Sequence, residues 1–154
     1  MILDEKLIGY VWEAFDVYVE RNQAITFATA LGEEDPVYFD RDAAISAGYR
    51  DVVVLPTFPI ALSQTQVSSI YHMLKMLEVD PASVLHGSQK FVYHRLVCVG
   101  DRLIGRKELT GLYQRKSGSL NFIETVVRYR DHDENLICED HCTLVSRVIK
   151  GKAA

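Results

Sequence analysis

Four long apolar segments in the second half of the chain constrain its fold more than any other feature. They span residues 88–96, 102–113, 120–129 and 136–148 and are rich in Val, Ile, Leu, Phe and Tyr, the residue types that favour strands. The sequences that separate them, VGD, QRKSG and DHDEN, contain Gly or Asn, which can adopt the positive φ of a tight turn. Side chains at alternate positions share a face of a strand, and two segments show such faces: Ile123, Thr125, Val127 and Tyr129, and Leu136, Cys138, Cys142 and Leu144. The pattern predicts an antiparallel meander of long strands.

The first half of the chain mixes one strand with helices. Alternating apolar residues predict a strand over residues 11–19, and helical spacing predicts a helix over 21–31 that stops at Gly32. Residues 32–39 are predicted to be a loop, and Asp40 is predicted to cap a short helix through Ser46. From Pro59 to about Glu78 an apolar stripe predicts a long helix; it comprises Ile60, Val67, Ile70, Tyr71, Leu74 and Leu77. We therefore expect one α+β domain over residues 1–154, in which a curved antiparallel sheet wraps a long central helix.

Composition excludes several classes of function. The 154 residues carry a formal net charge of −4 and no long basic run, which argues against nucleic acid as a partner. No stretch approaches the roughly 18 apolar residues of a membrane span, and charges at residues 4–6 argue against a signal peptide. Three cysteines, an odd number, favour reduced thiols packed in a core, and they lack the neighbouring ligands of a zinc site. We expect a soluble cytoplasmic protein without a metal.

Three motifs carry a resemblance to a known family. They are FATALGEEDPVYFD, AGYRDVVVLPTF and LHGSQKF followed by VGDRL. In this order and spacing the chain resembles the MaoC-like dehydratases of the hot-dog fold, from about Leu7 to Arg147. The resemblance is to the type found as the N-terminal half of two-hot-dog dehydratases, the FAS1-type dehydratase region. It implies reversible hydration of a 2-enoyl thioester, or dehydration of the (R)-3-hydroxyacyl thioester, with the acyl group on coenzyme A or an acyl carrier protein and with no cofactor.

The resemblance also points to a catalytic loop, which is altered here. Dehydration beside a thioester needs a base, an acid and a donor to the carbonyl oxygen, and the family uses an Asp and a His in a Gly-Asp-x-Asn-Pro-x-His loop. Residues 32–38 read Gly-Glu-Glu-Asp-Pro-Val-Tyr, so Glu33 replaces the Asp, Asp35 the Asn and Tyr38 the His. A tyrosine is a poor base at neutral pH, and Glu33 is one methylene longer than Asp, which misplaces a reacting group. Glu33 and Tyr38 are thus candidate catalytic residues of a degenerate loop, and the resemblance implies a partner hot dog that supplies the Asp/His pair.

Other residues are candidates for substrate binding, each with a structural alternative. Backbone N–H groups after the LPTF motif could bind a thioester carbonyl or a phosphate, although its prolines could simply mark the start of a helix. By resemblance His86 and Gly87 line the acyl channel or a dimer contact, while His86 could instead hydrogen-bond a loop. Gln89 could orient the backbone or a substrate amide, and Asp35 could be a turn acid. The candidate substrate-binding residues are Asp35, Pro56, Thr57, Phe58, His86, Gly87 and Gln89.

Three hypotheses of function follow. In the first, the chain is a hot-dog subunit that forms the acyl-binding channel and depends on a catalytic partner chain. In the second, it is a self-sufficient homodimeric hydratase, or a thioesterase, that uses Glu33 with Tyr38 or His86. In the third, it is a non-catalytic module that binds acyl thioesters. The sequence leaves open the acyl chain, the carrier and the choice between homodimer and heterodimer.

Overall fold

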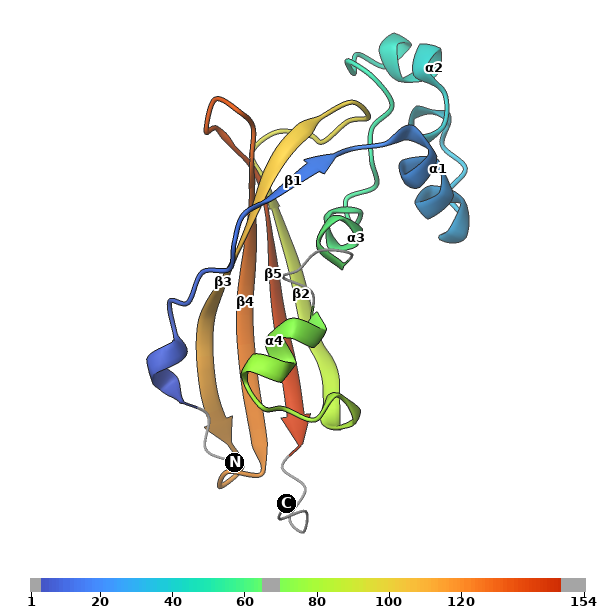
Figure 1. Ribbon diagram of the computed structural model, residues 1–154. Coiled ribbons are helices and arrows are strands. Elements are labelled where there is room, and N and C mark those ends of the chain that lie inside the picture. The colour runs from blue at the N-terminus through green and yellow to red at the C-terminus, as the bar shows by residue number, and fades with distance from the viewer. Residues whose placement is uncertain (1–3, 65–69, 148–154) are drawn as a thin grey trace.

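The computed structural model describes residues 4–64 and 70–147, and a five-stranded antiparallel sheet dominates it (Figure 1). The strands are β1 (Phe15–Tyr18), β2 (Val84–Tyr93), β3 (Arg102–Arg115), β4 (Leu120–Arg130) and β5 (Leu136–Arg147), in the spatial order β1-β3-β4-β5-β2. The prediction of an antiparallel meander is confirmed for β3, β4 and β5. The sheet therefore ends in two edges, a four-residue β1 and a ten-residue β2.

The predicted first strand is too long. Only Phe15–Tyr18 pairs with β3, and Val11 forms an isolated bridge to Glu108 with its side chain exposed. The preceding chain follows β3 through separate backbone hydrogen bonds, such as Trp12 N to Lys107 O at 3.0 Å. The alternation of apolar residues was thus a correct signal for Val17, which is buried, but it did not mark a continuous ladder.

Within residues 4–64 and 70–147, the α-helices before β2 are α1 (Arg21–Ala30), α2 (Arg41–Ser46), α3 (Pro59–Gln64) and α4 (Ile70–Met76). The first two agree with the sequence prediction, and Asp40 caps α2 by accepting from Ala43 N at 2.8 Å. The structure describes two parts of the predicted long helix, α3 and α4. The residues between them, 65–69, include Val67 and lie outside the described residues. The predicted stripe is wrong at Tyr71, which is 70% exposed, whereas Met73 is buried. Residues i and i+2 of an α-helix are rotated by about 200° from each other, so the side chains of Tyr71 and Met73 lie on opposite faces of α4.

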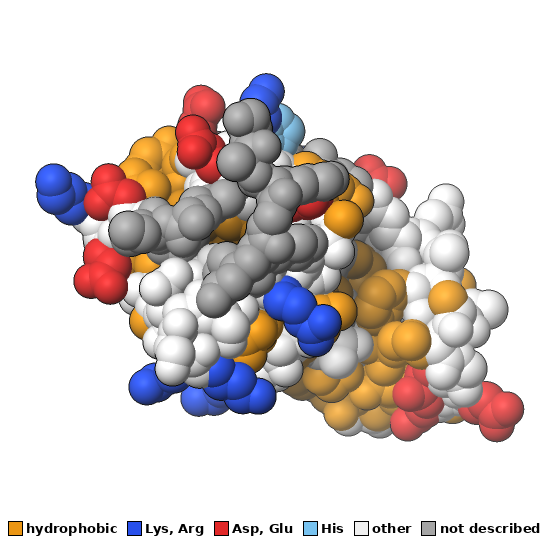
Figure 2. All heavy atoms as spheres, turned by 90° about the horizontal axis from the view of Figure 1, so that it is seen from below, with side chains coloured by type: hydrophobic (Ala, Val, Ile, Leu, Met, Phe, Trp, Pro, Cys, Tyr) orange, Lys and Arg blue, Asp and Glu red, His pale blue; other side chains and the backbone are white. Residues whose placement is uncertain are grey.

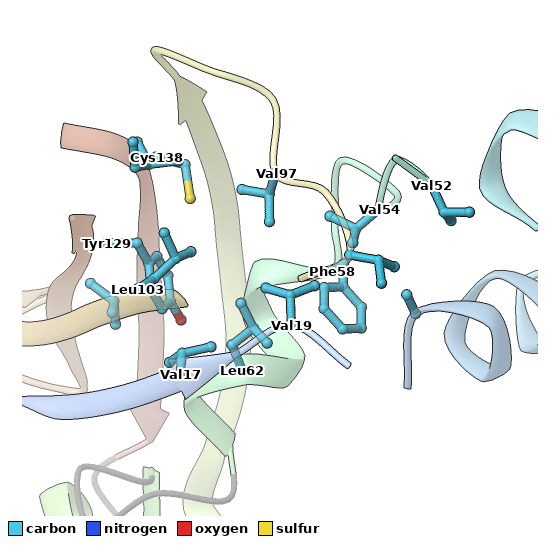
Figure 3. Close-up of a cluster of buried hydrophobic side chains, with 14 residues drawn as sticks. Val17, Val19, Val52, Val54, Phe58, Leu62, Val97, Leu103, Tyr129 and Cys138 are labelled. Atoms are coloured by element: carbon cyan, nitrogen blue, oxygen red, sulfur yellow. The ribbon is translucent and has the colours of Figure 1, made fainter. Parts of the chain in front are cut away.

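Two hydrophobic clusters join the helices to the sheet. The first contains side chains from the sheet, from residues 52–58 and from α1 and α3; Figure 3 shows Phe58 lying near Val19 and Val54. The second lies under α4, where Met73, Leu74 and Leu77 pack against β3, β4 and β5. The curved sheet and the helices on it confirm the α+β fold class.

The segment that carries α1 and α2 projects from one end of the sheet (Figure 1). Backbone hydrogen bonds attach it to the chain between β2 and β3, including Val54 N to Val97 O at 3.1 Å and Val99 N to Val52 O at 2.9 Å. Among residues 4–64 and 70–147, no helix has the length and apolar character needed to cross a bilayer. The three cysteines are free thiols, as predicted.

Candidate functional site

The loop at residues 32–38 lies in the projecting segment, and its acidic side chains bind its own backbone. The Glu33 carboxylate oxygen Oε1 accepts from the backbone N–H groups of Glu34 and Asp35, each at 3.0 Å. Asp35 caps the short 3-10 helix Pro36–Tyr38 by accepting from Val37 N at 3.1 Å. Both carboxylates therefore brace the loop, which matches the turn role considered for Asp35.

Tyr38 is a poorer base than a free tyrosine. Burial raises the pKa of its hydroxyl, and the nearby carboxylates of Glu33 and Asp35 raise it further. A phenol in this setting keeps its proton at neutral pH, so it can donate or accept a hydrogen bond but cannot take up a proton as a general base. The loop therefore brings Glu33, Asp35 and Tyr38 together as expected, but in an arrangement that suits a braced turn.

The LPTF residues form the turn that leads into α3. Pro56 and Thr57 are exposed, and the Pro56 carbonyl accepts from the Tyr93 hydroxyl at 2.8 Å. The backbone N–H of Phe58 bonds to Leu55 O at 2.9 Å, so the turn itself uses this donor. The Phe58 side chain is buried, with its ring edge against Phe27. A role of these residues in binding a thioester stays a prediction.

The HGSQ motif lies on β2, where the structure brings His86 and Gln89 together. The pairing of β2 with β5 shifts register between His86 and Ser88, so Gly87 forms a bulge. A Cβ on Gly87 would lie 3.0 Å from Thr143 O, a tight contact that explains the glycine. The bulge places His86 three residues before Gln89 on the same side, and His86 Nε2 lies 2.8 Å from Gln89 Oε1.

Gln89 connects His86 to a buried carboxylate. Its amide Nε2 donates to Oδ1 of Asp140 on β5, and Asp140 is only 3% exposed. Burial raises the pKa of Asp140 to about 6, although the charge of Lys107 and that of His86 oppose the shift. The exposed imidazole, the amide and the buried carboxylate thus form a continuous polar chain from the surface into the sheet.

Lys107 on β3 is the second buried charge of this region. Its side chain is 7% exposed, and its Nζ lies 5.7 Å from the centre of the Trp12 ring. Burial lowers the pKa of this ammonium, with Asp140 among the opposing influences. Lys107 and Asp140 flank Val127 of β4 from β3 and β5, and buried charges of opposite sign are costly unless they are paired with each other or with another polar group.

A small cavity of about 60 Å³ lies among these groups, between the sheet and helices α3 and α4. His86, Gln89, Lys107 and Asp140 line it together with apolar residues that include Ile60 and Met73. A larger groove of about 610 Å³ lies on another side of α3, against β1 and α1. Phe58 lines this groove, and apolar side chains gather beneath the projecting segment in the view from below (Figure 2). Of the candidate substrate-binding residues, His86 and Gln89 line the small cavity and Phe58 lines the groove.

Sequence reasoning missed the two buried charges, although alternation could have found them. Asp140 lies between Cys138 and Cys142 on the inward face of the last strand, and Lys107 lies two residues before the buried Leu109. A charged residue at an inward position of a strand is unusual and marks a partner or a site.

The sequence analysis also missed the structural role of Asp101, because the sequence indicated only a turn at Gly100-Asp101. It is buried, accepts from Cys98 N at 2.8 Å and forms ion pairs with Arg50 and Arg95. Since Arg50 belongs to the projecting segment, Asp101 helps to fix that segment on the sheet.

Comparison with known proteins places this geometry in a family. The model of the FAS1-like dehydratase domain region matches residues 6–140. A UPF0336 protein of Saccharopolyspora erythraea is 31% identical over 148 residues, which cover 96% of this chain and 93% of that protein. These matches span both the degenerate loop and the HGSQ motif.

Solved structures share the fold. The C-terminally truncated HadBC (3R-hydroxyacyl-ACP dehydratase) complex from Mycobacterium tuberculosis aligns with a TM-score of 0.76 and 25% identity, covering 91% of this chain and 97% of that one. The ChsH1-ChsH2 complex from the same organism aligns with a TM-score of 0.73 and 18% identity, covering 93% and 87%. The sheet and its helices are therefore a hot-dog fold, and the chain belongs to the FAS1-like dehydratase region family of MaoC-like hot-dog proteins.

Proposed function

We propose that this chain is the acyl-binding subunit of an (R)-specific 3-hydroxyacyl-thioester dehydratase or 2-enoyl-thioester hydratase. A partner hot-dog chain supplies the Asp/His pair. The observation that carries the proposal is the Glu33 carboxylate, which stands at the acid/base position of the loop yet accepts two N–H groups of that loop. The raised pKa of Tyr38 at the histidine position supports the same conclusion.

In the part of the chain that the structure describes, β2 is an edge strand of the sheet, and this supports dependence on a partner. The strand is ten residues long, and Leu85 on it is 67% exposed. Long uncovered edges with apolar side chains promote pairing with another chain. A second hot dog that adds its own edge strand to β2 would cover Leu85 and bring its loop close to His86. The structural relatives are complexes by name, HadBC and ChsH1-ChsH2.

In this proposal the acyl group enters beside His86 and occupies the cavity between the sheet and α3. His86 and Gln89 line the entrance, and Gly87 allows the bulge that turns both side chains toward it. Pro56, Thr57 and Phe58 form the turn at the other end of β2, where the Tyr93 hydroxyl donates to the Pro56 carbonyl, and Phe58 lines the larger groove against α1. Asp35 keeps the neighbouring loop in its capped form.

A hydration assay with crotonyl-CoA tests the proposal. The purified chain is assayed alone and then co-expressed with a hot-dog chain that carries Gly-Asp-x-Asn-Pro-x-His. We expect turnover only in the mixture, and we expect that Asp→Asn in the partner's loop abolishes it. In the same complex Glu33→Gln should leave kcat within about twofold, because general acid–base groups contribute roughly 100-fold or more.

Two results would favour the other hypotheses. Robust turnover by the chain alone, lost in Glu33→Gln, would show a self-sufficient enzyme. Stabilisation by acyl thioesters without turnover in any mixture would show a binding module. A further variant, Leu85→Asp, should weaken association with the partner, measured by analytical ultracentrifugation, while Tyr71→Asp on the exposed face of α4 serves as the matched control.

A further inference from the structure

The cavity under α3 and α4 differs from a channel for a fatty chain, because its floor carries charge. Asp140, Lys107 and Gln89 reach it from β5, β3 and β2, while Ile60 and Met73 close it from the helices. Asp140 and Lys107 are almost completely buried. A hydrocarbon chain in contact with these groups would displace water from them and return no hydrogen bond, which is unfavourable.

The polar groups retain capacity to bind an oxygen atom. A carboxylate has about four acceptor sites, and Gln89 uses one of them at Oδ1 of Asp140. Burial raises the pKa of Asp140 to about 6, so near neutral pH it can accept from a hydroxyl and, when protonated, donate to a carbonyl. Lys107 on β3 lines the same cavity from the other side of β4 and brings a positive charge to it.

The size of the cavity limits the ligand further. A volume of about 60 Å³ holds only a few non-hydrogen atoms, far below the roughly 300–1,000 Å³ of sites that enclose a whole drug-sized ligand. Among the residues that line the cavity, His86 on the edge strand β2 is exposed, so we place the entrance beside it. The cavity therefore fits the end of an acyl group that enters from that edge.

We propose that Asp140 and Lys107 make this chain selective for short acyl thioesters that carry a hydroxyl or carbonyl oxygen at the far end of the acyl group. The inference rests on the proposed function, since it assumes that an acyl thioester occupies the cavity. Gln89 positions the Asp140 carboxylate, and His86 holds Gln89 at the entrance.

A set of three acyl thioesters tests the selectivity in the 154-residue chain. Binding of 5-hydroxypentanoyl-CoA, pentanoyl-CoA and decanoyl-CoA is measured by calorimetry and by the rise in Tm. We expect the hydroxylated ligand to bind about tenfold more tightly than pentanoyl-CoA, the value of one hydrogen bond to a charged group, and decanoyl-CoA to bind most weakly.

Variants of the two charges provide the second arm of the test. The double variant Lys107→Met with Asp140→Leu replaces them by apolar residues of similar size, a change that folded proteins tolerate well. It should reverse the preference between the two short ligands, so that pentanoyl-CoA binds more tightly than 5-hydroxypentanoyl-CoA, while decanoyl-CoA stays the weakest because the cavity keeps its size. Lys90→Met, on an exposed position of β2, is the matched control and should keep the native order. If the double variant fails to fold, Asp140→Asn takes its place and should reduce the preference for the hydroxylated ligand.

The possible outcomes distinguish a failure of the proposed selectivity from a failure of the proposed acyl-binding function. Equal affinity of the native chain for hydroxylated and plain pentanoyl-CoA would overturn the selectivity and leave the acyl-binding role intact. An unchanged order of affinity in the charge variants would also overturn the roles of Asp140 and Lys107. Failure of all three thioesters to bind would contradict the proposed function itself.

Discussion

The loop at residues 32–38 and the polar cavity under α3 and α4 hold acidic residues in opposite ways. In the loop the Glu33 carboxylate is partly exposed and bonds to neighbouring backbone N–H groups. In the cavity the Asp140 carboxylate is buried, bonds to a side chain of another strand and has a raised pKa. The hydrogen bonds of the loop carboxylate are determined by residues adjacent in sequence, whereas those of the cavity carboxylate are determined by the tertiary fold.

This difference shows that a residue can occupy the catalytic position of a family motif without having the burial and shifted pKa of a reactive group. Strongly perturbed pKa values mark groups that the fold has placed at a cost, and such groups cluster at functional sites. By this criterion the sheet interior is the better candidate for ligand recognition, and the loop is a brace. Asp101 attaches the segment that carries the loop to the chain between β2 and β3, through ion pairs with Arg50 and Arg95.

The largest effect is expected at that junction. Asp101→Ala removes the acceptor of Cys98 N and the anion that two arginines share. We expect a loss of roughly 2–3 kcal/mol of unfolding free energy, because a hydrogen bond to a buried charged group contributes about that much, while the arginines regain water. Urea unfolding measures the loss. Asp16→Ala on β1, at an exposed carboxylate, is the control; an equal loss there would contradict a special role for Asp101.

A smaller effect of opposite sign is expected at Asp140. Its pKa is raised from 3.8 to about 6 in the folded protein, so the folded state binds the proton more tightly than the unfolded state. The stabilisation from this proton is complete below the unfolded pKa and is lost as pH rises through the folded pKa.

Asp140→Asn should therefore leave stability unchanged near pH 4 and raise it by about 2 kcal/mol at pH 8, relative to the native chain. The asparagine oxygen can still accept from Gln89, so the variant keeps that hydrogen bond. Urea unfolding across this pH range provides the measurement. A difference that does not change with pH would show that Asp140 does not titrate in this window.

Much of the fold was accessible from the sequence because local chemistry determines it. Turn residues fixed the ends of β3, β4 and β5, and a capping acid at residue 40 fixed the start of α2. Periodicity failed at Tyr71, whose side chain is exposed on the face of α4 opposite to that of the buried Met73. The loop at 32–38 was predicted by resemblance, and its braced geometry follows from residues within two positions of each other.

The cavity was not predictable in the same way. The contact of Gln89 with Asp140 joins residues 51 positions apart, and Lys107 comes from a third strand. Only the register of β2, β3, β4 and β5 brings them together, and the bulge at Gly87 changes that register by one residue. Sequence can identify a charge at an inward position of one strand, but its partners depend on pairings that no local rule supplies.

The smallest effect is expected at Glu33, where it decides what the loop carboxylate does. Glu33→Ala removes a side-chain acceptor from two backbone N–H groups and should cost about 1 kcal/mol, as the loss of a capping residue does. Glu33→Gln keeps an oxygen acceptor and should cost much less. Differential scanning calorimetry of both variants measures the two costs. If the carboxylate braces the loop, the loss of stability should depend on whether the side chain keeps an oxygen acceptor, as in Glu33→Gln, and not on whether it keeps its charge. A Glu33→Gln variant that keeps its stability but loses turnover with the partner chain would instead assign Glu33 to catalysis, and the contrast between the two regions would fail.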